Sequence, residues 1–265
     1  EEALADFHGR RAALLFGTGY QANLGALQAL VSRGDLILSD AMNHASLIDG
    51  CRLSGAEVTV YRHRDLGHLE ALLRRVRRGR RAWIVTAAVF SVDGDLAPLK
   101  GLAGLAERFG AGTVVDEAHA IGIFGSEGRG LVRALGLSGR FDAVVGTLSK
   151  ALGGAGGGVS GSRALVRLLQ STARAFLYTT APPPASAVAS LEALRLCRSR
   201  EGDRLRARLW RNALGLQEGL GGAGESPICA LGFRGVGAAG RASRALERRG
   251  FYVAALRPPT VPAGT

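Results

Sequence analysis

A chain of 265 residues, 47% of them hydrophobic, is long enough for one large α/β domain or for such a domain with a smaller one beside it. The formal net charge of +12 does not by itself indicate a nucleic-acid-binding protein, because no aromatic side chains interleave with the densest basic run, Arg74 to Arg81. Three widely spaced cysteines, Cys51, Cys197 and Cys229, form no metal-ligand cluster and indicate a reduced, cytoplasmic setting. No apolar run approaches the length needed to cross a bilayer.

Short apolar runs alternate with amphipathic helical stretches up to about residue 150. The expected strands are 11–16, 35–40, 57–62, 82–89, 112–118 and 141–147, and the expected helices are 20–33, 45–54, 66–76 and 97–110. Runs that are apolar throughout suit strands buried on both faces, with the helices as crossovers between them. The pattern predicts an α/β fold with a mostly parallel, doubly wound sheet, in which ligands bind at the carboxyl ends of the strands.

The pattern changes after about residue 185. One long helix is expected at 185–220, followed by a glycine-rich break, a strand at 228–233, a helix at 240–250 and a strand at 252–257. We interpret this as a large domain, 1–195, followed by a smaller C-terminal α+β domain, 196–265. The small domain ends without a closing element, so we expect it to be incomplete.

Lysine is nearly absent from this arginine-rich chain, and one of its lysines stands in a glycine-rich loop. Of the 34 Lys and Arg residues, only Lys100 and Lys150 are lysine. Arginine cannot replace lysine as an amine nucleophile, because a guanidinium does not deprotonate near neutral pH. Lys150 lies in GTLSKALGG, just after the strand expected at 141–147, where glycines let the backbone approach a ligand closely. We therefore interpret Lys150 as a residue that takes part in the chemistry through its amine.

An acid and a histidine follow the preceding strand. Asp116 ends a buried strand, where an unpaired carboxylate is costly, so we expect a cationic partner such as a protonated ring nitrogen. His119, three residues later, can reach the same ligand. The string DEAH also suggests a nucleotide hydrolase, but neither lysine stands in the pattern G-x-x-x-x-G-K-[ST] that such an enzyme needs.

The loop after the first strand, GTGYQAN, presents backbone N–H groups at a helix N-terminus, which suits a phosphate of any origin. Gly17, Gly19 and Ala22 also match the dinucleotide pattern G-x-G-x-x-G/A, and Asp40 stands roughly where a ribose-binding acid would lie. A nicotinamide-dependent oxidoreductase therefore stays open as an alternative.

Two further strand ends carry polar side chains. His44 starts a helix after the strand at 35–40, where its imidazole could stack on a planar ring or transfer a proton. Ser91 could donate a hydrogen bond to a ligand oxygen. The amine, the carboxylate, the histidine and the phosphate cradle together describe a pyridoxal phosphate (PLP) site. Lys150 would form an imine with the cofactor, and Asp116 would keep the pyridine nitrogen protonated.

These residues give the chain a resemblance to the α-oxoamine synthases, PLP-dependent transferases of fold type I. The motifs NHASLIDG, VFSVDGD, VDEAHAIGIFG and GTLSKALGG occur in the family's order and spacing, and the resemblance extends over essentially the whole chain. It implies a homodimer, with its active site at the subunit interface, that condenses an amino acid with an acyl thioester and releases carbon dioxide. The ending LRPPTVPAGT is most similar to members that join L-alanine to a pimeloyl thioester, on CoA or a carrier protein, in biotin synthesis. Glycine C-acetyltransferase is the nearest alternative.

The resemblance also implies roles for individual residues, without a metal, nucleic acid or membrane. The implied catalytic residues are Lys150, His44, Asp116 and His119. The implied cofactor-binding residues are Gly19, Tyr20, His44, Ser91, Asp116, His119, Thr147, Lys150 and, from a neighbouring subunit, Thr179. His44 and Thr260 would contact the substrate.

Three differences separate the chain from the family's pattern. Ala87 stands where relatives usually carry an acidic residue, so some support for the site would be missing. The family's N-terminal segment, and the stretch beyond Thr265 with its carboxylate-binding arginine, are not in the sequence. We therefore expect this chain to be a fragment of a longer enzyme.

Overall fold

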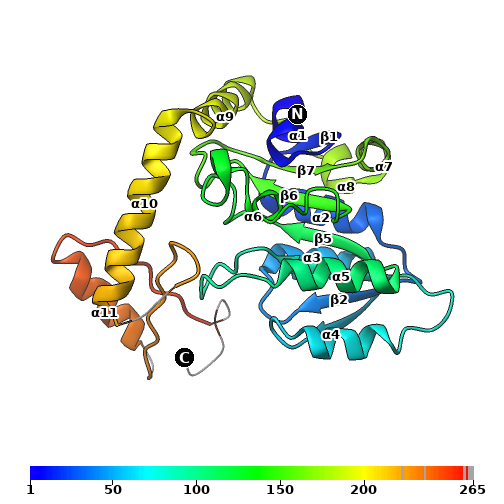
Figure 1. The fold of residues 1–265 in the computed structure, drawn as a ribbon, viewed down its shortest axis with the longest axis horizontal. Coiled ribbons are helices and arrows are strands. Elements are labelled where there is room, and N and C mark those ends of the chain that lie inside the picture. Colours follow the sequence, from blue (N-terminus) through cyan, green and yellow to red (C-terminus); the bar gives the residue numbers. More distant parts are fainter. Residues whose placement is uncertain (222–223, 236, 259–260, 262–265) are drawn as a thin grey trace.

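A seven-stranded sheet with the strand order β1-β7-β6-β5-β4-β2-β3 forms the centre of the computed structural model (Figure 1). The structure describes residues 1–221, 224–235, 237–258 and 261. The strands are β1 Ala12–Phe16, β2 Leu36–Asp40, β3 Glu57–Tyr61, β4 Ala82–Ala87, β5 Gly112–Asp116, β6 Ala143–Thr147 and β7 Gly157–Gly161. Strands β2 to β6 pair in parallel, whereas β7 pairs antiparallel with both β1 and β6. The predicted mostly parallel α/β sheet is confirmed.

Strand β7 is the element that the sequence did not reveal. Its residues, Gly157–Gly161, lie in a glycine-rich stretch with little strand propensity, so the sequence pattern predicts no strand there. All five residues are buried. A Cβ atom at Gly157 would lie 2.5 Å from Gly19 Cα, so glycine is needed here for a helix to approach the sheet.

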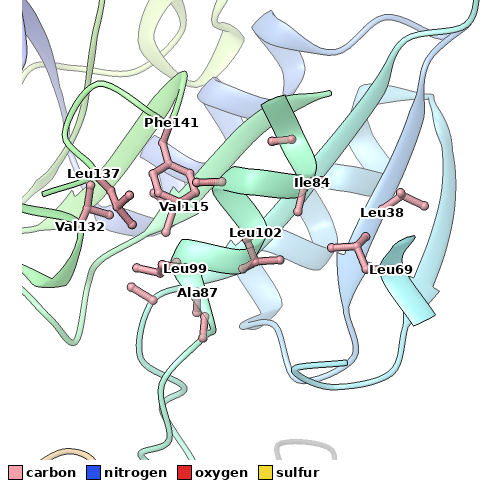
Figure 2. Packing of buried hydrophobic residues seen from close by; sticks show 14 of the residues in the cluster. Leu38, Leu69, Ile84, Ala87, Leu99, Leu102, Val115, Val132, Leu137 and Phe141 are labelled. Atoms are coloured by element: carbon pink, nitrogen blue, oxygen red, sulfur yellow. The ribbon is translucent and has the colours of Figure 1, made fainter. Parts of the chain in front are cut away.

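Helices cover both faces of the sheet. The α-helices among the described residues are α1 Glu2–His8, α2 Gly19–Leu30, α3 Ala45–Ser54, α4 Leu66–Leu73, α5 Leu99–Phe109, α6 Leu131–Ala134, α7 Arg163–Thr172, α8 Arg174–Leu177, α9 Pro184–Cys197, α10 Arg200–Gly219 and α11 Ala238–Glu247, of which α10 and α11 lie away from the sheet (Figure 1). On one face, Leu38 and Ile84 of the sheet pack against Leu69 of α4 and Leu102 of α5 (Figure 2). A second cluster joins α2, α3 and α7 to the other face. Each buried leucine contributes about 1.5–3 kcal/mol to stability.

The C-terminal part differs from its prediction in two ways. The helix expected at 185–220 is divided into α9 and α10, because Ser199 caps a new helix by accepting a hydrogen bond from the backbone N–H of Gly202. The strands expected at 228–233 and 252–257 are not formed, since neither segment has a ladder partner in the part of the chain that the structure describes. Helix α10 leads away from the sheet towards α11 (Figure 1). Among the described residues, no helix is both long and apolar enough to span a bilayer.

Candidate active site

A cavity of about 220 Å³ opens at the carboxyl ends of β4, β5 and β6, beside the N-termini of α2 and α3. The predicted site residues that line it are Gly19, Tyr20, His44, Ser91, Asp116, His119, Thr147 and Lys150. They come from five different segments of the chain. The sheet therefore brings them together at the edge where ligands of doubly wound folds bind.

Asp116 is the last residue of β5 and is 7% exposed. Its Oδ2 accepts a hydrogen bond from Asn23 Nδ2 at 2.7 Å, and its Oδ1 accepts one from the backbone N–H of Ala118 at 2.8 Å. Among the described residues, the hydrogen-bond donors to Asp116 are thus a neutral amide and a peptide group. They orient the carboxylate without neutralising its charge, which faces the cavity.

Lys150 and His119 meet in the cavity. Lys150 Nζ lies 2.9 Å from His119 Nε2. Burial and the charges of Lys150 and His44 lower the pKa of His119 to about 4, so its ring is neutral at pH 7 and can accept a hydrogen bond from Lys150. Burial also lowers the pKa of Lys150, against the opposing charge of Asp116. The lowered pKa increases the fraction of Lys150 present as the free amine, which is the form that acts as a nucleophile.

The N-terminus of α2, where a phosphate cradle was predicted, lines the cavity. Thr18 caps the helix by accepting a hydrogen bond from the backbone N–H of Gln21 at 3.0 Å. A Cβ atom at Gly19 would lie 3.1 Å from Thr147 Cβ, so glycine lets the first turn sit close against the end of β6. First-turn N–H groups have no acceptor within the helix and attract anions. The hydroxyl of Thr147, 2.9 Å from that of Ser149, adds a polar group to this wall.

Three other cavity residues have defined surroundings. Tyr20 is 43% exposed and donates a hydrogen bond from its hydroxyl to Asp49 at 2.5 Å. His44 caps α3, and its Nδ1 accepts from the backbone N–H of Ser46 at 3.2 Å. Ala87 presents a methyl group to the cavity at the position where an acidic residue was expected, and its backbone N–H donates to Asn43 Oδ1.

Two predicted residues are not among those that line the cavity. Thr179 is exposed, and its hydroxyl donates to the backbone carbonyl of Ala175 at 2.6 Å. Thr260 lies outside the described residues.

Asn23 is a cavity residue that sequence reasoning missed. Its Nδ2 donates to Asp116 and also lies 2.9 Å from Ser46 Oγ, so it joins α2, β5 and α3. Asn23 is the last residue of the quoted motif GTGYQAN, which was the available signal. No local pattern could reveal its partner, because Asp116 lies 93 residues further along the chain.

Asp40 is not available as the ribose-binding acid that the oxidoreductase alternative requires. Asp40 is 3% exposed, and its carboxylate already accepts hydrogen bonds from the backbone N–H groups of Met42 and Arg64 and from His63. An acid that is buried and occupied in this way is not open to a ribose hydroxyl.

The residues present fit PLP. Lys150 supplies an amine, Asp116 a carboxylate for a protonated ring nitrogen, and α2 a helix N-terminus for the phosphate. Asn23 Oδ1 is a buried acceptor without a partner among the described residues, so the cavity wall still has hydrogen-bonding capacity.

Comparisons with known proteins agree with this assignment. The family model for aminotransferase class I and II matches residues 1–263. The 8-amino-7-oxononanoate synthase of Anaeromyxobacter dehalogenans is 48% identical over 271 residues, covering 100% of this chain and 68% of that protein. The solved serine palmitoyltransferase of S. paucimobilis, with bound PLP and myriocin, gives a TM-score of 0.93 at 36% identity and covers 100% of this chain and 68% of that one.

A solved 8-amino-7-oxononanoate synthase, from Francisella tularensis, gives a TM-score of 0.82 at 31% identity and covers 98% of this chain and 77% of that one. The family match thus extends over nearly the whole chain, and Lys150 and Asp116 line one cavity within it. The chain belongs to the aminotransferase class I and II family, whose cofactor is PLP.

Proposed function

We propose that the protein condenses L-alanine with a pimeloyl thioester to form 8-amino-7-oxononanoate in biotin synthesis. Carbon dioxide and the thiol carrier, CoA or a carrier protein, would be released. The curated relatives with this name are 46–49% identical to the chain, against 36% for the serine palmitoyltransferase. The observation that carries the chemistry is the meeting of Lys150, His119 and Asp116 in one cavity.

PLP, when bound, would supply an acceptor for the electron pair left at the α-carbon of the amino acid. Lys150 would hold the cofactor and move the α-proton, since its lowered pKa favours the free amine that does both. His119, neutral at pH 7, would keep Nζ oriented through its 2.9 Å contact. Asp116, aligned by Asn23, would hold the proton on the ring nitrogen.

The remaining roles follow the same geometry. The first turn of α2, with Gly19 and Tyr20, and the hydroxyl of Thr147 would bind the phosphate. His44 would cover one side of the ring and contact the substrate, and Ser91 would donate a hydrogen bond to a ring oxygen. Thr260 would contact the substrate.

The same proposal includes a homodimer. Leu177 and Tyr178 are 46% and 73% exposed, and Thr179 follows them directly. A second copy over this segment would remove the apolar side chains from water, and Thr179 of the partner subunit would complete the phosphate site. We divide each subunit into a large domain, 1–195, and a small domain, 196–265. The three cysteines are free, which supports an enzyme of the reducing cytoplasm.

Borohydride trapping tests the imine-forming lysine. Purified protein is mixed with PLP and reduced, and the labelled peptide is located by mass spectrometry. Label is expected on Lys150 and not on exposed Lys100, and it should be lost in Lys150→Arg. Equal label on both lysines, or label that persists in Lys150→Arg, would contradict the assigned role.

The substrates are tested with the same preparation. L-alanine with pimeloyl-CoA should give carbon dioxide and free thiol, whereas glycine with acetyl-CoA and L-serine with palmitoyl-CoA should give much less. The serine palmitoyltransferase pair belongs in this panel because of the structural likeness. Preference for either control pair would keep the α-oxoamine synthase chemistry and overturn the choice of substrates.

A further inference from the structure

A charged cluster lies behind one wall of the cavity. We call it the His63 cluster, and it contains Asp40, His63, Arg64, Asp95 and Glu225. The ring of His63 bridges two carboxylates, with Nδ1 2.7 Å from Asp40 Oδ1 and Nε2 2.7 Å from Asp95 Oδ2. Asp40 ends β2, His63 follows β3 and Asp95 follows β4. One imidazole therefore joins the segments that follow three strands.

Both contacts can be hydrogen bonds only when the ring is an imidazolium. A neutral imidazole has one N–H and one lone pair, and an ionised carboxylate can only accept. Burial alone lowers the pKa of His63, but the hydrogen bonds and charges of Asp40 and Asp95 outweigh burial, so the pKa is raised. The protonated ring is thus the form that this geometry favours.

The surrounding charges act in the same direction. Arg64 NH1 lies 3.0 Å from Asp95 and 2.8 Å from Glu225, so the three carboxylates of the cluster face one guanidinium and His63. A neutral His63 would leave two negative charges in excess. Tyr61, the neighbouring buried phenol, adds no charge, because burial and Asp40 raise its pKa.

Backbone strain marks the same place. Arg64 has φ 58°, a left-handed conformation that is uncommon for a residue other than glycine. Its backbone N–H donates to Asp40 Oδ2 at 3.0 Å, and its guanidinium holds Asp95 and Glu225. Strained residues persist only where several contacts over-determine them, and they concentrate at functional sites.

The His63 cluster is joined directly to the cavity wall. Asp40 accepts a hydrogen bond from the backbone N–H of Met42, which lines the cavity two residues before His44. On the other side, the ring of His63 packs edge-on against Phe90 with 4.4 Å between centroids. The backbone N–H of Phe90 donates to the carbonyl of Asp95, which closes the turn that carries Ser91.

We propose that His63 is a positioning residue whose imidazolium clamps the loop 40–44 and the turn 89–95 together, and that loss of its proton releases both from the cofactor pocket. The proposal rests on the proposed function, because it takes this cavity to be the PLP site. A histidine whose pKa is raised by folding stabilises the folded structure at a pH below its unfolded pKa. This stabilisation is lost as the pH rises through the folded pKa. The clamp is therefore closed in mild acid and opens in base.

Hydrogen exchange of the cofactor-free protein tests the clamp. Protection factors are measured for peptides covering 40–44 and 88–97 from about pH 6 to about pH 9. In the wild type they should fall by about tenfold or more across this range, as expected for the loss of a charge-assisted hydrogen bond. His63→Gln should have low protection at every pH, and its affinity for PLP should be about tenfold weaker.

Asp95→Asn supplies the sharper comparison. Asp95 Oδ2 contacts both His63 Nε2 and Arg64 NH1, so an amide oxygen at that position can accept from both but lacks the charge that raises the pKa of His63. Protection should therefore be lost at a lower pH in this variant than in the wild type. His68→Gln is the matched control, because the ring of His68 accepts the backbone N–H of Arg62 at 2.9 Å and is not among the described residues that line the cavity. It should behave like the wild type.

Three results would overturn the proposal. They are pH-independent protection in the wild type, wild-type protection in His63→Gln, and equal pH dependence in Asp95→Asn and the wild type. If His63→Gln does not fold, the ring resonances of His63 in the wild type decide, since a pKa at or below the ordinary value of 6.5 contradicts the clamp. Hydrogen exchange needs neither substrate nor cofactor. An intact clamp in a protein that does not use L-alanine would contradict only the proposed function.

Discussion

Asn23 shows how much of the candidate site depends on one neutral side chain. It is 2% exposed, and its single Nδ2 group contacts both Asp116 and Ser46. Removing it leaves the buried carboxylate with one backbone donor, and leaving a buried charged group short of a partner costs more than the hydrogen bond itself contributes.

We expect Asn23→Ala to lower the free energy of unfolding by about 2 kcal/mol and to weaken PLP binding, because Asp116 loses its alignment. Urea denaturation and a PLP titration measure the two effects. Asn212→Ala, on the exposed side of α10, is the control and should change stability by less than about 0.5 kcal/mol. If the two variants behave alike, Asn23 does not orient Asp116.

The close approach of β7 to the start of α2 decides where this helix N-terminus, the proposed phosphate cradle, lies. A Cβ atom at Gly157 would lie 2.5 Å from Gly19 Cα and 2.6 Å from Gly19 N, and both atoms belong to backbone that cannot rotate away. A methyl group here must therefore displace the first turn of α2 from the sheet.

Gly157→Ala should lower the free energy of unfolding by about 2 kcal/mol and reduce PLP affinity, since overpacking moves the cradle. Gly104→Ala on α5 is the matched substitution, because a Cβ atom there would meet nothing within 4 Å. It should raise stability by about 0.5–1 kcal/mol through helix propensity. Denaturation of both variants, followed by PLP titration, would refute the packing argument if Gly157→Ala were also neutral.

For the molecule as a whole, buried histidine sets a limit on stability in acid. His8 is 2% exposed, and its Nδ1 lies 2.8 Å from Ser160 Oγ. Burial, with the charges of Arg10 and Arg133, lowers its pKa from 6.5 to about 4. The unfolded chain therefore binds a proton that the folded chain refuses, so this contribution is present above pH 6.5 and is lost as the pH falls towards 4.

Between about pH 8 and about pH 5, the wild type should lose about 2 kcal/mol more stability than His8→Gln. Urea denaturation at both pH values gives the difference. The comparison with the variant is needed because Glu117, whose pKa burial raises to about 7, changes stability in the opposite direction. Parallel pH curves for the two proteins would show that His8 titrates normally.

Much of the sheet could be predicted because its strands are buried on both faces. The runs 82–87 and 112–116 are buried along their whole length, as expected for central strands of a sheet that is covered on both faces. Their order along the chain predicts the crossovers. Strand β7 could not be predicted, since its glycines make room for α2 at Gly157, for Leu4 of α1 at Gly158 and for Leu165 of α7 at Gly161, and do not reflect strand propensity. The strands expected near residues 230 and 255 failed for the converse reason, because apolar content without a pairing partner does not make a strand.

Residue chemistry alone singled out the amine and the carboxylate that line the candidate site. Lysine can act as an amine nucleophile where arginine cannot, and a carboxylate at the end of a buried strand requires a partner, so Lys150 and Asp116 stood out in the bare sequence. The contacts that support these residues could be identified only from the tertiary structure. Asn23 reaches Asp116 across 93 residues and His63 reaches Asp95 across 32, because strand order, which no local pattern encodes, brings these segments to one edge of the sheet.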